Sequence, residues 1–265
     1  MPSEPSREAR TASPDVEFGR NFKRKNITSR GDPFAYLRHF DTAFLIDDSE
    51  SMKDYWDEVR ALLNAIADLC VTYDENGIDI YFVNHRPAGD FFMGNYGYKN
   101  IGNTNGMLEF HDNVAGIFHN VKPKGKCRLD RALRHIFHKY MTTLEKKVTM
   151  SNGKRGIKPL NLIVISAGYV DVNPFKELLK CAEWLDKLEA PPYQVGVQLF
   201  QIGNDERVRE NWEYADNELA QKGGSRDMID TVTWTGKQGE LSAEGVLKVV
   251  LGSVCRSIDK MEVDG

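Results

Sequence analysis

Three oxygen-bearing residues at alternate positions, Asp47, Ser49 and Ser51, form the clearest chemical pattern in the chain. They end and follow the apolar run FDTAFLID of residues 40–47. A carboxylate at the end of a strand and two hydroxyls on the next turn can therefore converge on one point. Hard cations such as Mg²⁺ take oxygen ligands and keep several waters, so this set suits them. The same turn has a purely structural interpretation, in which a serine hydroxyl caps the helix that follows.

Cys127 is a second candidate for chemistry, because neighbouring cations activate thiolates and Lys126 and Arg128 flank this cysteine. The C-x5-R pattern of phosphatases would need arginine at a position that holds Leu133. The six histidines form neither an HxH nor an HExxH pattern, which disfavours a zinc enzyme. We therefore predict a domain that is not an enzyme, and a cysteine-dependent enzyme using Cys127 stays an alternative.

The composition excludes several classes of protein. The chain has 265 residues, a formal net charge of −4 and 41% hydrophobic residues, which is too apolar for wholesale disorder and not basic enough for a general nucleic-acid binder. No apolar stretch approaches the roughly 18 residues of a membrane span, and the N-terminus lacks the pattern of a signal peptide. The four cysteines form no CxxC pair: Cys70, Cys127, Cys181 and Cys255. We expect reduced thiols in a cytoplasmic protein that binds neither membranes nor nucleic acid.

From residue 40 onward, apolar runs of strand length alternate with segments of helical period. This alternation predicts an α/β fold, with a doubly wound, mostly parallel sheet and helices on both faces. Strands are expected at residues 40–47, 77–83, 162–166, 194–202 and 228–234, with a short edge strand within residues 89–98. Helices are expected at residues 53–73, 106–120, 129–145, 174–189, 205–222 and 242–258.

Residues 1–31 are rich in proline, serine and charge and poor in apolar side chains, so we predict a disordered N-terminal tail. Residues 32–265 are predicted to form one domain. Eight basic and five acidic residues lie within residues 1–40, which leaves a net charge of −7 on the remainder. The Gly-, Asn- and aromatic-rich residues 89–106 are expected to form an irregular loop. A further alternative is a pure scaffold whose partner binds Tyr96–Asn105 or the tail.

In this order of strands, the chain resembles the von Willebrand factor A (vWA) domains, whose metal-ion-dependent adhesion site begins with D-x-S-x-S after the first strand. The resemblance is closer still to intracellular vWA-like proteins, mostly fungal. It runs from about residue 32 to residue 260. The phrases that carry it lie at residues 32–37, 40–52, 77–82, 158–165, 190–192, 194–198 and 227–231.

The resemblance implies a metal ion at the carboxyl end of the sheet, held by three loops, with a partner carboxylate completing its coordination. It also implies an adhesion or scaffolding module rather than an enzyme. Two loops depart from the family pattern: Cys127 stands at the position of a threonine ligand, and Ala167 at that of an aspartate ligand. A thiol and a methyl group are poor substitutes for oxygen ligands. The site is therefore predicted to be degenerate, with Mg²⁺ bound weakly or not at all.

The predicted function is protein–protein interaction at the surface formed by Asp47–Met52, Gly125–Asp130 and Ala167–Asp171. An alternative is Mg²⁺-dependent binding of a partner carboxylate through Asp47, Ser49 and Ser51. The residues predicted to contact the partner are Asp48, Glu50, Lys126, Arg128, Asp130, Tyr169 and Asp171.

Overall fold

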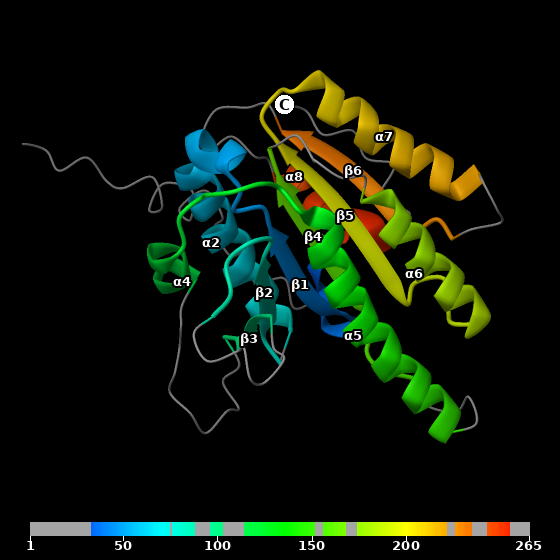
Figure 1. The fold of residues 1–265 in the computed structure, drawn as a ribbon. Coiled ribbons are helices and arrows are strands. Elements are labelled where there is room, and N and C mark those ends of the chain that lie inside the picture. Colours follow the sequence, from blue (N-terminus) through cyan, green and yellow to red (C-terminus); the bar gives the residue numbers. More distant parts are fainter. Residues whose placement is uncertain are drawn as a thin grey trace, which may run out of the picture.

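Six strands form one sheet in the order β3-β2-β1-β4-β5-β6. Figure 1 labels these strands. The computed structural model describes residues 33–74, 76–87, 96–102, 114–151, 156–167, 174–221, 226–234 and 243–254. All neighbouring strands are parallel except β2 and β3, which are antiparallel. The strands are β1 (Asp41–Ile46), β2 (Ile78–Phe82), β3 (Gly97–Ile101), β4 (Leu160–Ser166), β5 (Val195–Ile202) and β6 (Ile229–Trp234).

Helices cover both faces of the sheet. The α-helices are α2 (Trp56–Tyr73), α4 (Val114–Asn120), α5 (Leu129–Met150), α6 (Phe175–Lys187), α7 (Glu206–Gln221) and α8 (Ala243–Leu251). The 3-10 helices are η1 (Pro33–His39), η2 (Glu50–Tyr55) and η3 (Gly252–Val254). One hydrophobic cluster joins the sheet to α2, α4 and α8, and a second joins it to α5, α6 and α7. This arrangement confirms the predicted doubly wound α/β fold.

The order of the strands reverses between β1 and β4, because the chain continues from β1 to β2 on one side and returns to β4 on the other. In such sheets, ligands bind outside the carboxyl ends of the strands at this switch point. The register places Ile46 beside Ile165, so Asp47, the residue after β1, and Ser166, the last residue of β4, are neighbours. β4 and β5 are buried along their whole lengths, as expected for central strands.

Several boundaries differ from the expected ones. The 3-10 helix η2 precedes α2, because Met52 N–H donates to Ser49 O over three residues and tightens the first turns. α5 continues to Met150, since no glycine or proline interrupts it before Ser151. α8 ends at Leu251, where Gly252 packs so closely on Asp230 that a Cβ would collide with it. The predicted tail lies outside the described residues, as does most of the predicted loop at residues 89–106.

Candidate binding surface at the carboxyl end of the sheet

The Asp47 carboxylate lies at the switch point, fully buried, and both of its oxygens accept hydrogen bonds. Oδ1 accepts from the Ser49 backbone N–H at 2.9 Å, and Oδ2 accepts from the Ser166 hydroxyl at 2.7 Å. The Asp47 backbone N–H donates to Ile165 O. Asp47 therefore joins the end of β1 to the end of β4 and closes the turn that follows.

The two serine hydroxyls of the D-x-S-x-S pattern do meet. Ser49 Oγ and Ser51 Oγ lie 2.9 Å apart, with Ser49 buried and Ser51 exposed. Ser49 occupies the N-cap position of η2, but its side chain makes no capping hydrogen bond. The structural interpretation with a capping serine is therefore wrong. The Asp47 carboxylate closes this turn instead, through the Ser49 N–H.

Asp48 joins three segments from inside the protein. Its Oδ1 accepts from Asn84 N–H at 2.6 Å and its Oδ2 from His85 N–H at 2.8 Å, and its backbone carbonyl accepts from Lys124 N–H. Burial raises the pKa of Asp48, and these two N–H donors act in the opposite direction. The prediction that Asp48 contacts a partner needs correction, because a fully buried carboxylate with both oxygens engaged is not presented to solvent.

Residues 121–128, which we call the lysine loop, lie against this turn. Asn84 Nδ2 donates to Lys124 O at 3.0 Å and to Lys126 O at 3.2 Å, and Glu50 N–H donates to Gly125 O at 2.9 Å. Gly125 has φ +76°, a conformation that side-chain-bearing residues rarely adopt. The ends of β1 and β2 therefore fix the backbone of the loop, while the side chain of Lys126 is exposed.

The two substituted ligand positions lie in different hydrophobic clusters. Cys127 is buried with α5 residues in the second cluster, whereas Ala167 packs on the first. The Ala167 N–H lies 3.0 Å from Met52 Sδ, so a thioether contacts this backbone where the family pattern places a ligand loop. Neither position contributes an oxygen ligand.

The donors of the described residues fit Mg²⁺ poorly. Asp47 is the single carboxylate of the predicted ligand set, and its oxygens are already hydrogen-bonded inside the protein. Within the described ranges, no group of three or more His, Cys, Asp or Glu side chains could hold a metal ion. Mg²⁺ usually takes one or two carboxylates and completes its shell with water, whereas here both oxygens of the one carboxylate are already hydrogen-bonded.

Asp130, predicted to contact a partner, is also buried and engaged within the protein. Its two oxygens face Arg128 Nε at 3.1 Å and Arg128 Nη2 at 3.3 Å. Arg134 lies 3.9 Å from the same carboxylate and donates to Glu177 at 3.1 Å, so these ion pairs join α5 to α6. Burial alone would raise the pKa of Asp130, but the hydrogen bonds and charge of Arg128 bring it below its ordinary value. Asp130 therefore belongs to the support of the surface, and Arg128 is only partly exposed.

The remaining predicted residues divide into two groups. Glu50 is exposed and accepts a hydrogen bond from Lys53 at 2.6 Å, and the hydrogen bond and charge of Lys53 lower the pKa of Glu50. Tyr169 and Asp171 lie outside the described residues. Their predicted role stays a prediction.

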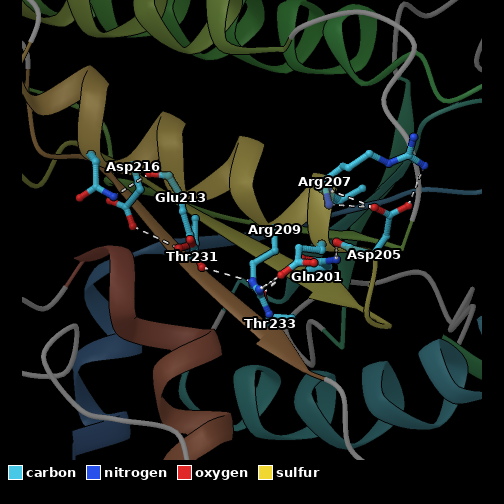
Figure 2. A network of polar contacts seen from close by, with 11 residues as sticks. Gln201, Asp205, Arg207, Arg209, Glu213, Asp216, Thr231 and Thr233 are labelled. Carbon is cyan, nitrogen blue, oxygen red and sulfur yellow. Dashed lines mark hydrogen bonds and ion pairs between the residues drawn. The ribbon is translucent and has the colours of Figure 1, made fainter.

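Sequence reasoning missed Asn84, Ser166 and the residues at the ends of β5 and β6. Figure 2 shows a polar network there, in which Gln201 donates to Asp205 O at 2.8 Å and accepts from Thr233 at 3.2 Å. Asp205 Oδ1 in turn accepts from the first N–H groups of α7. The rule that function follows strand ends could have found these positions, since each lies at or just after the end of a strand. The network fixes the loop after β5 at the same end of the sheet.

Comparisons with known proteins define no family for the chain. No family model matches it, and no curated protein matches it. Among solved structures, proximal thread matrix protein 1 from the mussel byssus is similar with a TM-score of 0.43 and 14% identity, over 82% of this chain and 48% of that one. The pilus adhesin SpaC from Lactobacillus rhamnosus GG is similar with a TM-score of 0.42 and 12% identity, over 83% of this chain and 30% of that one. The chain thus spans less than half of either protein, and similarities this low indicate nothing about what it binds. Among the described helices, none is both long and apolar enough to cross a membrane.

Proposed function

We propose that the chain is a vWA-type domain that binds a protein partner at the carboxyl end of its sheet and is not an enzyme. The strand order, the D-x-S-x-S turn at the switch point and the resemblance in the sequence support this assignment. The partner is bound by the exposed residues of the η2 turn and the lysine loop, together with the segment after Ala167.

One observation carries this proposal: the polar groups at the switch point are used to fix loops rather than to form a reactive centre. Asp47 and Asp48 each accept two hydrogen bonds from neighbouring loops. Exposed side chains such as Glu50, Lys53 and Lys126 are held on that fixed backbone. A rigid polar surface is what a protein partner requires, since a preorganised surface loses little entropy on binding. The burial of Cys127 disfavours its use as a nucleophile, which must be accessible.

Metal dependence is weak or absent in this proposal. The buried Asp47 carboxylate has a serine hydroxyl and a backbone N–H as its partners, which compensates its burial without a cation. The donor set thus favours metal-free recognition over an Mg²⁺ bridge to a partner carboxylate through Asp47, Ser49 and Ser51.

Cross-linking mass spectrometry of the chain in extracts of its own cells, with and without chelator, tests the proposal. We expect cross-links to a partner at Lys53, Lys124 and Lys126, unchanged by chelator. Exposed lysines elsewhere, such as Lys176 and Lys187, serve as internal controls. Calorimetric titration should show no Mg²⁺ or Mn²⁺ affinity tighter than about millimolar, a range typical of weak sites. Partner cross-links confined to the control lysines would contradict the location. Tight metal binding abolished in Asp47→Ala, or cross-links lost in chelator, would contradict metal independence.

A further inference from the structure

The lysine loop concentrates positive charge on a protein that is acidic overall. Between residues 122 and 135 there are six Lys or Arg residues and a single acidic residue, Asp130, in a chain whose formal net charge is −4. Lys122, Lys124 and Lys126 alternate along the loop and are all exposed. None of these three forms an ion pair with a carboxylate of the described residues. Their charges are therefore available to an outside anion.

Hydrogen bonds to the protein interior hold the backbone of the lysine loop. Lys124 N–H donates to Asp48 O at 2.8 Å, and the carbonyls of Lys124 and Lys126 accept from Asn84. The buried Cys127 anchors the end of the loop in the second hydrophobic cluster. With the polar backbone groups turned to the protein, the lysine side chains extend from a preorganised support, which lowers the entropic cost of binding.

Further cations lie beside the loop. The Arg86 guanidinium donates to Phe82 O at 2.6 Å and to His85 O at 2.8 Å, which fixes a positive charge at the end of β2. Burial lowers the pKa of His85, and the charges of Lys124 and Arg86 lower it further. The charge of Arg131 likewise acts on Arg86. The buried Asp48 carboxylate also acts on Arg86, in the opposite direction. The exposed positive charge beside the switch point is therefore carried chiefly by the lysine loop.

We propose that the lysine loop binds an acidic, Asp- or Glu-rich segment of a protein partner directly, through Lys122, Lys124 and Lys126 and without a metal ion. This proposal rests on the proposed function and names the chemistry of its partner. In a metal-dependent site, Asp47 would hold the cation that attracts a partner carboxylate. Because both oxygens of Asp47 are hydrogen-bonded inside the protein, the lysine side chains of the neighbouring loop supply the positive charge instead.

The chemistry of the loop favours a peptide over a nucleic acid. Its exposed cations at 122, 124 and 126 are lysines, which act as point charges toward carboxylates and phosphates alike. The formal net charge of −4 disfavours general binding to a nucleic acid. Residues 121–128 contain no aromatic side chain on which a base could stack.

Fluorescence polarisation with labelled octaglutamate tests the proposal on the full chain, with octaglutamine as the uncharged probe. The triple variant K122Q/K124Q/K126Q removes the charge of the loop. The matched triple K147Q/K176Q/K187Q removes the same charge from exposed lysines elsewhere. At low ionic strength, we expect the loop triple to weaken octaglutamate binding about tenfold, and the control triple by less than about twofold, since three exposed ion pairs are lost in one case only. Chelator should change neither value, and raising the salt to about 0.15 M should weaken wild-type binding.

Equal weakening by the two triples would overturn the proposal, as would octaglutamate binding no tighter than octaglutamine. Binding that requires Mg²⁺ would replace it with a metal bridge. A thymidine octanucleotide serves as the competing probe. If it binds the wild-type chain about tenfold more tightly than octaglutamate does, and this tighter binding disappears in the loop triple, the loop is assigned to nucleic acid. If partner cross-links still occur at the carboxyl end of the sheet while the loop triple has no effect on octaglutamate, the proposed function survives and this inference fails.

Discussion

Buried polar side chains gather in two regions of this domain, and the two regions treat them differently. At the carboxyl end of the sheet, the carboxylates of Asp47 and Asp48 have both oxygens hydrogen-bonded. Toward the amino ends of the strands, beside α8 and η3, a second set of polar side chains is incompletely paired; four of them are buried and Ser253 is partly buried. We call this set the α8 seam: Thr42, Asn161, Gln198, Asp230 and Ser253.

The α8 seam contains two pairs of register partners on neighbouring strands. Thr42 is the register partner of Asn161, and Gln198 that of Asp230. Asn161 Nδ2 donates to Val250 O at 2.7 Å near the end of α8, and Gln198 Oε1 accepts from Ser253 N–H at 3.2 Å. Among the described residues, Thr42, Asn161, Gln198 and Ser253 each have one buried side-chain atom without a hydrogen-bond partner: Oγ1, Oδ1, Nε2 and Oγ, respectively.

The difference shows that pairing, more than polarity, decides what a buried polar residue contributes. A paired carboxylate at the switch point holds two or three loops in one arrangement, which a recognition surface needs. An unpaired amide or hydroxyl in the seam loses its water without full compensation, which costs about 1–3 kcal/mol per group. The hydrogen bonds of the seam therefore hold α8 on the sheet, but its unpaired groups lower the free energy of unfolding. At the switch point, the paired carboxylates hold the loops rigid.

The largest expected effect is from Asp48→Ala. The substitution leaves the N–H groups of Asn84 and His85 without their acceptors and detaches the end of β2 from β1. We expect the free energy of unfolding to fall by about 2–4 kcal/mol, the sum for two partly buried donors. Urea denaturation at neutral pH measures it. The exposed Asp54→Ala is the control and should change stability by less than about 0.5 kcal/mol. Equal effects of the two substitutions would show that the switch point is not specially constrained.

Two deletions of a single hydroxyl should have opposite signs. Ser166→Ala removes the donor to Asp47 Oδ2 and should destabilise by about 1.5–3 kcal/mol, because the bond goes to a buried carboxylate. Thr42→Val keeps the shape of the side chain and removes an unpaired oxygen, so it should stabilise by about 1 kcal/mol. Midpoints of urea unfolding at constant m-value compare the two variants directly. Destabilisation by Thr42→Val would mean that its hydroxyl has a partner such as a bound water, and would remove the distinction between the regions.

The sequence predicted the strands well because alternation of apolar runs and helical segments is a local signal. It also predicted that Asp47 lies where the first strand ends, and the structure places it directly after β1. It could not predict that Asp48 and Asp130 are buried, since a charged residue is ordinarily exposed and their partners are set by the fold. The partners of Asp48 lie 36 and 37 residues away, at Asn84 and His85.

The exact ends of helices escaped prediction for a similar reason. Gly252, the residue after α8, packs against Asp230, a contact between distant segments that no local pattern reveals. The role of Ser166 depends on the register between β1 and β4, which one sequence does not specify. Local pattern therefore locates the candidate surface, and tertiary pairing decides which of its side chains face outward.

The last prediction tests whether an unpaired buried atom behaves differently when its group can titrate. His135 Nε2 is buried on α5 without a hydrogen-bond partner among the described residues, and its ring lies 3.6 Å from that of Tyr96 between centroids. Burial, and then the charges of Arg86, Lys139 and Lys99, lower the pKa of His135 from 6.5 to about 4. Between these values the unfolded chain binds more protons than the folded one, so the free energy of unfolding should fall as the pH drops from about 6.5 to about 4.

In His135→Gln this contribution to the pH dependence should disappear, which urea unfolding at several pH values between about 4 and 7 would measure. His138→Gln removes an exposed imidazole from the same helix and should keep the wild-type slope. An unchanged slope in His135→Gln would mean that an anion or a water pairs with Nε2 and stabilises the imidazolium. His135 would then count as a paired group, like Asp47 and Asp48. The α8 seam alone would then represent the unpaired groups in the comparison.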